Sequence, residues 1–199
     1  MKKPNNRKAL LYAAGIAALL ILSLILCLCL GKEKNIPVLK VETPQKPSAS
    51  QTDTFTLDVT VSSLGDDLYP AMSASIRFDP AYLEFVGIEE GNMFVTDVDL
   101  GKALPTWSCN PEQCNKTGLI NVMYLDLTGG KAAFRQSLLS DGDHVVFRLT
   151  FRLRGSARSG DVYILSVEDA VFAASDERQS LAMTSNTLKA KDGKIMVGD

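Results

Sequence analysis

The stretch VVFRLTFRLR, residues 145–154, decides the fold class of this 199-residue chain. Every second residue from Val145 to Leu153 is apolar, and from Arg148 onwards arginine and threonine occupy the positions between them. Side chains of a β-strand point alternately to its two faces, so a period of two marks a strand with one buried face. The stretch therefore predicts a strand that covers a hydrophobic core on one side only.

The same alternation recurs along the rest of the chain. FTLDVTV (55–61) and MSASIRF (72–78) show it clearly, and further candidate strands lie at 83–89, 119–125, 161–167 and 188–197. Turn residues such as Gly129-Gly130 separate the runs, and Asp192-Gly193 predicts a hairpin within the last one. Eight or nine short strands of this kind predict an all-β fold, a two-sheet sandwich or jelly roll.

A corner joins two of these strands in SASIRFDPAYLEFVGIEEGN, residues 73–92. Pro80 has no N–H to donate to a strand ladder, and Asp79 before it favours a turn. One strand therefore ends near Phe78 and the next begins near Leu83, with a single helical turn expected at Ala81 and Tyr82.

The N-terminal part predicts a membrane anchor. Residues 9–30 carry no charge over 22 positions, which is enough for a helix to span a bilayer. Four basic residues precede this segment: Lys2, Lys3, Arg7 and Lys8. Positive charges beside a membrane span normally stay in the cytoplasm, so residues 1–8 are expected there and the part of the chain after the anchor is expected outside the cell. A cleaved signal peptide and a lipoprotein signal remain alternatives, although Leu precedes both Cys27 and Cys29 and no A-x-A site follows the segment.

A spacer and one exported domain follow the predicted anchor. Residues 31–53 include Pro37, Pro44 and Pro47 and predict an extended spacer, with a possible first edge strand at 36–42. The predicted sandwich occupies residues 54–199. Residues 35–199 carry 15 of the 21 Lys and Arg but 22 of the 23 Asp and Glu. This acidic balance argues against a nucleic-acid partner.

Cys109 and Cys114 are the two cysteines outside the predicted anchor. In an exported protein, a pair with four residues between them is most simply a disulfide that closes a loop. Free thiols and a metal site are the alternatives, but zinc normally takes four ligands and the chain holds one histidine, His144. We therefore predict a disulfide and no metal site.

The sequence carries no recognisable catalytic constellation. It has no G-x-S-x-G motif and no nucleotide-binding glycine loop. Acidic pairs such as Asp66/Asp67 and Asp141/Asp143 lie in loops or at strand ends, where acids are usually solvated, which argues against the facing carboxylates of a glycosidase. Weak calcium binding by D-x-D runs such as Asp141/Asp143 is an alternative. The row Arg148, Arg152 and Arg154 either pairs with acids across strands or binds an anionic glycan or lipid headgroup. Trp107 either anchors a partner or fills one end of the core.

Several fragments, taken in order, resemble cohesin modules. SIRFDPAYLEFVGIEEGN is similar to the cohesin strand that ends in aromatic-Asp-Pro, with the Leu-Glu strand and acidic-Gly turn that follow. GLINVMYLDLTGG, GDHVVFRLTFRLRGSARSGD, VEDAVFAASDERQSL and DGKIMV resemble later cohesin segments in the same order, so the resemblance covers residues 38–197. It implies a nine-stranded jelly-roll sandwich without catalytic activity or a cofactor of its own.

The resemblance also implies a partner. Cohesins bind dockerin modules on bacterial polysaccharide-degrading enzymes, in cellulosomes or at the cell surface, and the dockerin carries the calcium. The face that would bind is built from residues 71–78, the segment near Trp107, and residues 119–125 and 161–167. Alternation places five residues outward on this face, Ser73, Ser75, Arg77, Asn121 and Met123, with Asp126 at its rim. Trp107, in the segment that the resemblance adds to the face, is the seventh candidate contact residue.

The sequence thus predicts a membrane-anchored, cohesin-like module that binds dockerin-bearing enzymes outside the cell. The Cys109–Cys114 loop departs from the general cohesin pattern. The alternative is a carbohydrate-binding module of the same sandwich fold, which would bind polysaccharide through a row of exposed aromatic residues. The candidates for such a row are Trp107, Tyr69, Tyr82 and Tyr163. A pilin-like structural subunit is a third alternative, but residues 9–30 lack the glutamate that pilin helices carry.

Overall fold

The computed structural model describes residues 36–43, 46–49, 53–93, 106–139, 144–185 and 187–199. The predicted basic tail at 1–8 and the predicted anchor at 9–30 lie outside these ranges. Within the ranges, no helix is both long and apolar enough to cross a bilayer. Residues 36–199 form one compact unit, so folded structure begins inside the segment predicted as a spacer.

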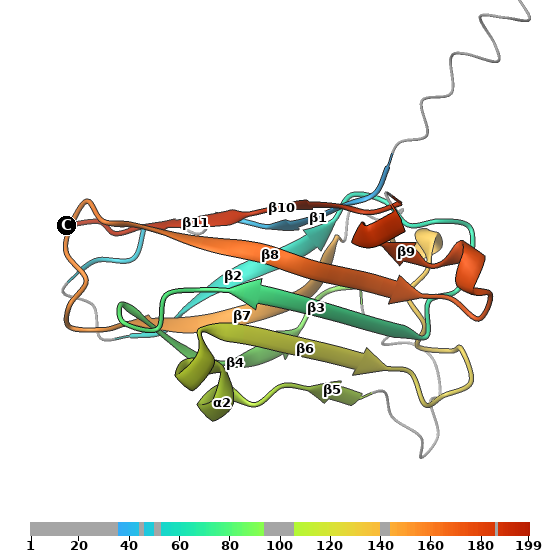
Figure 1. Ribbon diagram of the computed structural model, residues 1–199, viewed down its shortest axis with the longest axis horizontal. Coiled ribbons are helices and arrows are strands. Elements are labelled where there is room, and N and C mark those ends of the chain that lie inside the picture. Colours follow the sequence, from blue (N-terminus) through green and yellow to red (C-terminus); the bar gives the residue numbers. More distant parts are fainter. Residues whose placement is uncertain (1–35, 44–45, 50–52, 94–105, 140–143, 186) are drawn as a thin grey trace, which may run out of the picture. The chain divides into compact units, whose positions relative to one another are not determined.

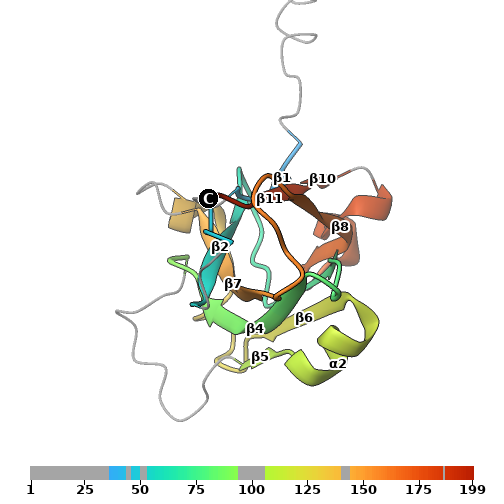
Figure 2. The ribbon, with the colours of Figure 1, turned by 90° about the vertical axis from the view of Figure 1, so that its left-hand side faces the viewer.

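The unit is a sandwich of two sheets, which Figure 1 shows facing one of the sheets and Figure 2 shows along the strands. The first sheet has the order β10 (Lys189–Lys191), β1 (Val38–Val41), β2 (Phe55–Val61), β7 (Val145–Leu153) and β4 (Leu83–Glu90). The second has the order β11 (Gly193–Met196), β8 (Val162–Ala173), β3 (Ala71–Arg77), β6 (Leu119–Leu125) and β5 (Thr106–Ser108), and β9 (Leu181–Ala182) pairs with β8. The pairing is antiparallel except between β1 and β10.

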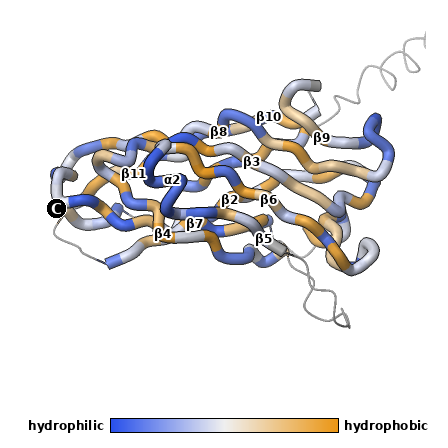
Figure 3. Tube along the Cα trace, turned by 60° about the horizontal axis from the view of Figure 1, so that its bottom comes forward, coloured by the Kyte–Doolittle hydropathy of each residue, from blue (hydrophilic) through white to orange (hydrophobic). Residues whose placement is uncertain are grey.

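The alternation in the sequence matches the burial of the strands. In β7, Phe147, Leu149 and Phe151 are fully buried, whereas Arg148 and Arg152 stay half-exposed on the outer face. Aromatic rings join the two sheets inside the sandwich, since Phe151 of β7 packs edge-on against Phe78, with ring centroids 5.5 Å apart. Figure 3 shows the hydrophobic and hydrophilic positions alternating along the strands. The predicted all-β sandwich is confirmed.

The last strand differs from the prediction. Residues 188–197 do not form a hairpin, because β10 pairs with β1 in the first sheet and β11 pairs with β8 in the second. The chain changes sheet at Asp192, and Gly193 is required there because a Cβ at this position would lie 2.6 Å from a methyl carbon of Val41. The expected nine strands become eleven among the described residues, since the last strand is split and β9 is added. β1 falls within the predicted 36–42 but is not an edge strand, because β10 lies outside it.

One α-helix, α2 (Pro111–Thr117), was missed by the sequence analysis, which treated this segment as a loop. Its ends follow standard capping chemistry. Asn110 is the N-cap and accepts a hydrogen bond from the Gln113 N–H, Pro111 opens the helix, and Gly118 ends it in the left-handed conformation. At seven residues the helix is too short for a periodic apolar pattern to reveal it. Short 3₁₀ turns complete the fold at Gln136–Leu139, Glu177–Gln179 and Met183–Ser185.

The corner between β3 and β4 forms as predicted. The N–H groups of Tyr82 and Leu83 both donate to the carbonyl of Asp79, and the Asp79 carboxylate accepts the N–H of Ala81. These bonds close a single tight turn at residues 79–83, and the chain crosses from the second sheet to the first.

Candidate protein-binding face

The outward side of β8, β3, β6 and β5, here called the β3–β6 face, brings together five of the seven predicted contact residues. The pairing of β3 with β6 places Ser73 opposite Met123, Ser75 opposite Asn121, and Arg77 opposite Leu119. Arg77, Asn121 and Met123 are exposed, while Ser73 and Ser75 are half-buried. Their shared orientation follows from alternation, but their role in binding stays a prediction.

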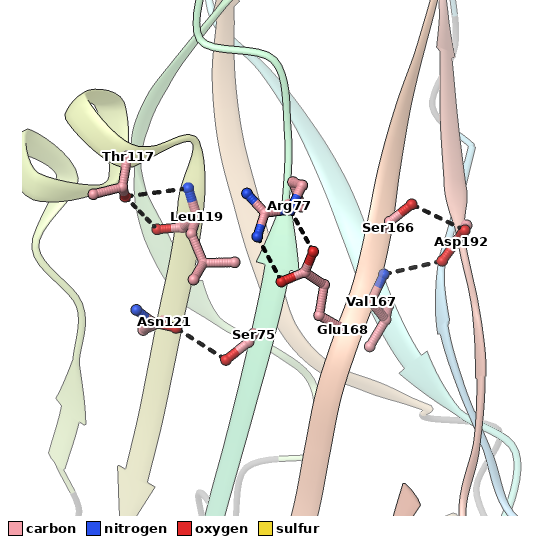
Figure 4. Close-up of polar contacts among 9 residues, drawn as sticks. All are labelled: Ser75, Arg77, Thr117, Leu119, Asn121, Ser166, Val167, Glu168 and Asp192. Atoms are coloured by element: carbon pink, nitrogen blue, oxygen red, sulfur yellow. Dashed lines mark hydrogen bonds and ion pairs between the residues drawn. The ribbon is translucent and has the colours of Figure 1, made fainter.

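Hydrogen bonds across the strands organise the centre of this face (Figure 4). The Ser75 hydroxyl donates to Oδ1 of Asn121 at 2.9 Å. The guanidinium of Arg77 holds both carboxylate oxygens of Glu168 on β8, with Nη2 2.8 Å from Oε2. The hydrogen bond and the charge of Arg77 lower the pKa of Glu168, and the same contact raises the pKa of Arg77.

A β-bulge brings Glu168 into reach of Arg77. The register of β3 and β8 shifts between Ser75, which pairs with Asp169, and Ile76, which pairs with Val167, so Glu168 is an extra residue. Bulges leave a backbone group without a ladder partner. Here the Val167 N–H donates to the Asp192 carboxylate at 2.9 Å, and the Ser166 hydroxyl donates to its other oxygen at 3.1 Å. The residue at which the chain changes sheet therefore also supports the face (Figure 4).

Apart from Met123, the sequence analysis missed the exposed apolar residues of this face. Met123 is 59% exposed, and the unpredicted Leu125 beside it on β6 is 43% exposed. At the other end of the sheet, three further apolar side chains are exposed: Val162, Ile164 and Met196. The signal was present, because alternation with the buried Tyr163 and Leu165 directs Val162 and Ile164 outward. The face thus has a polar centre between two apolar ends.

The prediction that Asp126 contacts a partner at the rim is not supported by its geometry. The side chain is 8% exposed. Its carboxylate accepts the N–H and hydroxyl of Thr128 at 2.7 and 2.5 Å, and the N–H of Gly130 at 2.8 Å. All of these bonds lie within residues 126–130, so Asp126 shapes the loop after β6.

Trp107, one of the seven predicted contact residues, directs its ring into the interior. Its ring packs against Tyr124, Phe147 and Phe134, with centroids 4.8, 5.6 and 6.3 Å away. β5 aligns Trp107 with Tyr124, an inward position of β6, and this register directs the indole into the core. Of the two interpretations of Trp107, filling the end of the core is the one that the packing supports.

The aromatic row required by a carbohydrate-binding surface is not exposed in the described part of the chain. Tyr69 and Tyr163 are 1% and 9% exposed, and Tyr82 and Trp107 are half-buried. Tyr82 stacks on Tyr163 with centroids 5.0 Å apart, and the Tyr163 hydroxyl donates to Asp161. These rings pack against one another and not along an open strip.

Cys109 and Cys114 are free thiols in the structure, with their sulfur atoms 3.9 Å apart. The predicted disulfide is therefore not formed here, and the redox state of the pair in the cell stays a prediction. Burial, followed by the neighbouring Cys114, raises the pKa of Cys109 to about 12. The thiol is accordingly neutral at physiological pH, which makes it a poor nucleophile.

A pocket of about 330 Å³ opens on the β3–β6 face next to these thiols. It exists because β5 pairs with only Met123, Tyr124 and Leu125 of β6, and the chain then turns into α2. On the sheet side the pocket is lined by Ser73, Ser75, Asn121 and Met123. The other side is lined by the corner between β5 and α2, including Ser108, Cys109, Gln113 and Cys114.

Asn115 fixes the position of α2 against the opposite sheet. Its Oδ1 accepts the N–H of Phe85 on β4 at 2.9 Å, and its Nδ2 donates to the Phe85 carbonyl at 2.8 Å. The side-chain amide therefore pairs with β4 as a neighbouring strand would. β4 is the edge strand of the first sheet, and this contact supplies hydrogen-bond partners to its Phe85 backbone. It also holds α2, which forms one wall of the pocket, in place.

The basic row lies on the outer face of the first sheet and is largely paired. Arg148 binds Asp58 at 3.0 Å, and Arg152 binds Glu84 at 3.4 Å. Arg154 donates to the carbonyl of Leu83. The cross-strand interpretation of this row therefore holds for its first two members. Among the described residues, no group of three His, Cys, Asp or Glu side chains is placed to hold a metal ion.

Comparisons with known proteins agree with this architecture. The family model of the cohesin domain matches residues 41–195. The comparison with curated proteins gives no match. Among solved structures, the third cohesin of ScaC from Acetivibrio cellulolyticus, solved in complex with the ScaB dockerin, is 16% identical with a TM-score of 0.58. The alignment covers 82% of this chain and 99% of that one.

Two further structures show how widely the fold extends. The OlpA cohesin of a type I cohesin–dockerin complex from Clostridium thermocellum is 18% identical, with a TM-score of 0.57 and coverage of 82% and 99%. A non-cellulosomal cohesin from the archaeon Archaeoglobus fulgidus is 10% identical, with a TM-score of 0.53 and coverage of 82% and 91%. At such identities the structures establish the fold alone. The family model, which spans most of the chain, shows that this protein belongs to the cohesin domain family.

Proposed function

We propose that this chain is a non-catalytic binding module that docks a dockerin-bearing protein on its β3–β6 face. The observation that carries the proposal is the cohesin match over residues 41–195, in a sandwich that exposes this face. Two of the similar structures are cohesins solved in complex with dockerins. Polysaccharide-degrading enzymes, which carry dockerins in other cohesin systems, are the proposed cargo.

The composition of the face supports a protein partner. A stable interface buries about 800 Å² per partner and combines apolar contact area with hydrogen-bonding groups. Met123, Leu125 and Ile164 supply exposed apolar area, while Asn121, Ser75 and Asp169 supply hydrogen-bonding groups between them. Sheet strands hold all of these positions, so little ordering is needed on binding.

The proposal assigns calcium to the partner and the membrane to the N-terminus. A dockerin would bring its own calcium, and this chain would need no cofactor. Residues 9–30 would hold the module at the outer surface of the cell membrane, with residues 1–8 in the cytoplasm. The uncharged run and the basic residues before it support this arrangement.

Binding is tested with the full-length chain and with dockerin-bearing enzymes encoded in the same genome, by calorimetry in calcium and after chelation. Met123→Asp places a charge on the proposed face, where we expect affinity to fall at least tenfold. Val86→Asp is the matched control, because Val86 is 38% exposed on β4 in the other sheet. Its affinity should equal that of the wild type.

Two outcomes contradict the proposal. If no dockerin binds the wild-type chain while circular dichroism shows it to be folded, the cohesin fold has lost this function. If Val86→Asp weakens binding as much as Met123→Asp, the partner does not use the β3–β6 face. If binding persists after chelation, docking does not require calcium on the partner, and that part of the proposal is wrong.

A further inference from the structure

The pocket between β6 and the β5–α2 corner lies within the proposed binding face. It arises from this chain's own sequence, in which Asn110 and Pro111 start a helix directly after the three-residue strand β5. The first half of β6 therefore has α2 beside it where a strand would otherwise continue. Four predicted contact residues line the pocket, namely Ser73, Ser75, Asn121 and Met123.

The lining has a consistent chemical character. None of the residues that line this pocket is charged at neutral pH. Burial keeps the Cys109 thiol protonated, and Ala74 and Val122 contribute apolar surface. Ser75 and Asn121 already bond to each other, whereas Ser108 and Gln113 lie exposed at the rim.

This character restricts the group that the pocket can hold. An ionised side chain would lose part of its hydration without gaining a counter-charge, which is unfavourable. An uncharged side chain would displace water from apolar walls and meet hydroxyl and amide groups at the rim. With about 330 Å³, against roughly 30 Å³ for one water in the liquid, the pocket has room for a large side chain.

We propose that this pocket is the specificity site of the β3–β6 face and receives one large, uncharged side chain of the docked dockerin. The inference rests on the proposed function and adds the chemistry of the anchor residue. Large side chains buried in a pocket commonly dominate the binding energy of an interface. The β5–α2 corner would then select among dockerins according to the residue that each presents at this point.

Two substitutions in the full-length chain test the pocket directly. Ser108→Trp fills it from the rim, and Gln113→Glu places a carboxylate on its wall with almost no change in size. Both residues are exposed, and the Gln113 side chain makes no described hydrogen bond, so the fold should tolerate both changes. Ser175→Trp and Gln179→Glu are the matched controls, because both residues are exposed in the segment after β8.

The binding partner is the dockerin that binds the wild-type chain most tightly. We expect each pocket variant to weaken binding at least tenfold and each control to stay within twofold of the wild type. Each uncharged residue on the binding face of the dockerin is also replaced with alanine. For the residue that enters the pocket, this substitution should weaken binding to the wild-type chain but cause no further loss of affinity for Ser108→Trp. If both pocket variants bind with wild-type affinity, the inference that the pocket receives a dockerin side chain is wrong, whereas the proposal that the β3–β6 face binds the dockerin is unaffected. If no dockerin binds the wild type, the proposed function fails and this inference fails with it.

Discussion

Replacing Asn115 with alanine tests how the fold holds the β5–α2 corner. Asn115 makes three hydrogen bonds through its side chain, two to the backbone of Phe85 on β4 and one to the Pro111 carbonyl at 2.9 Å. Phe85 is 1% exposed, so its backbone groups have little access to water. In the alanine variant the Phe85 N–H and carbonyl lose these partners.

The expected cost follows from these bonds. A typical hydrogen bond contributes about 1 kcal/mol net, and a buried group left without a partner costs roughly 1–3 kcal/mol. Because the site is only partly buried, water can replace some of the lost contacts. We expect Asn115→Ala to lower the free energy of unfolding by about 2–3 kcal/mol, which lowers Tm by roughly 5–10 °C in a domain of this size.

Differential scanning calorimetry and urea denaturation of the same protein measure this loss. Glu112→Ala on the same helix is the control, because its ion pair with Lys116 is exposed and worth less than about 0.5 kcal/mol. Asn115→Asp should also destabilise, since a carboxylate cannot donate to the Phe85 carbonyl. A loss below about 0.5 kcal/mol in Asn115→Ala would refute the argument that this amide fixes α2 to β4.

Three further changes probe the other contacts that shape the face. Asp126→Ala removes the carboxylate that organises residues 126–130, and denaturation should show a loss of about 2–3 kcal/mol, whereas a loss within error would mean that the loop forms without it. Asp192→Ala leaves the Val167 N–H of the bulge without its partner; a loss of about 1–2 kcal/mol is expected in the same assay, and an unchanged stability would contradict the support given to the bulge. Arg77 lowers the pKa of Glu168 below its ordinary 4.5, so their pairing stabilises the fold above that pH and the contribution is lost as pH falls through the lowered value. Between about pH 5 and pH 3 the wild type should therefore lose more stability than Glu168→Gln, and parallel pH profiles would contradict the pairing.

The β-sandwich and the orientation of most strands were predictable because they depend on local pattern. A period of two fixes which side chains of a strand share a face, whatever that strand pairs with. Ser73, Ser75, Asn121 and Met123 were placed correctly on this basis, and the same rule could have identified Ile164. The resemblance to cohesins was also visible in the sequence, because fragments from residues 75–92 to the final strand follow one another in the same order as the cohesin segments.

Features that depend on pairing between distant segments were not predictable. The sequence at Asp192-Gly193 is compatible with a hairpin, and only the packing of Gly193 against Val41 shows that the chain changes sheet there. The bulge that brings Glu168 to Arg77 is a mismatch between two strands, so neither strand contains it alone.

The sequence by itself determined the fold class, the buried side of each long strand and the resemblance to cohesins, because these follow from periodicity and order. Tertiary structure alone decided the rest of the candidate site. Trp107 turns inward because a three-residue strand aligns it with Tyr124. The Asp126 carboxylate is not available to a partner because it accepts hydrogen bonds from the N–H groups of Thr128 and Gly130 in its own loop. The pocket exists because α2, too short to be seen by periodicity, lies beside β6 where a strand would otherwise continue.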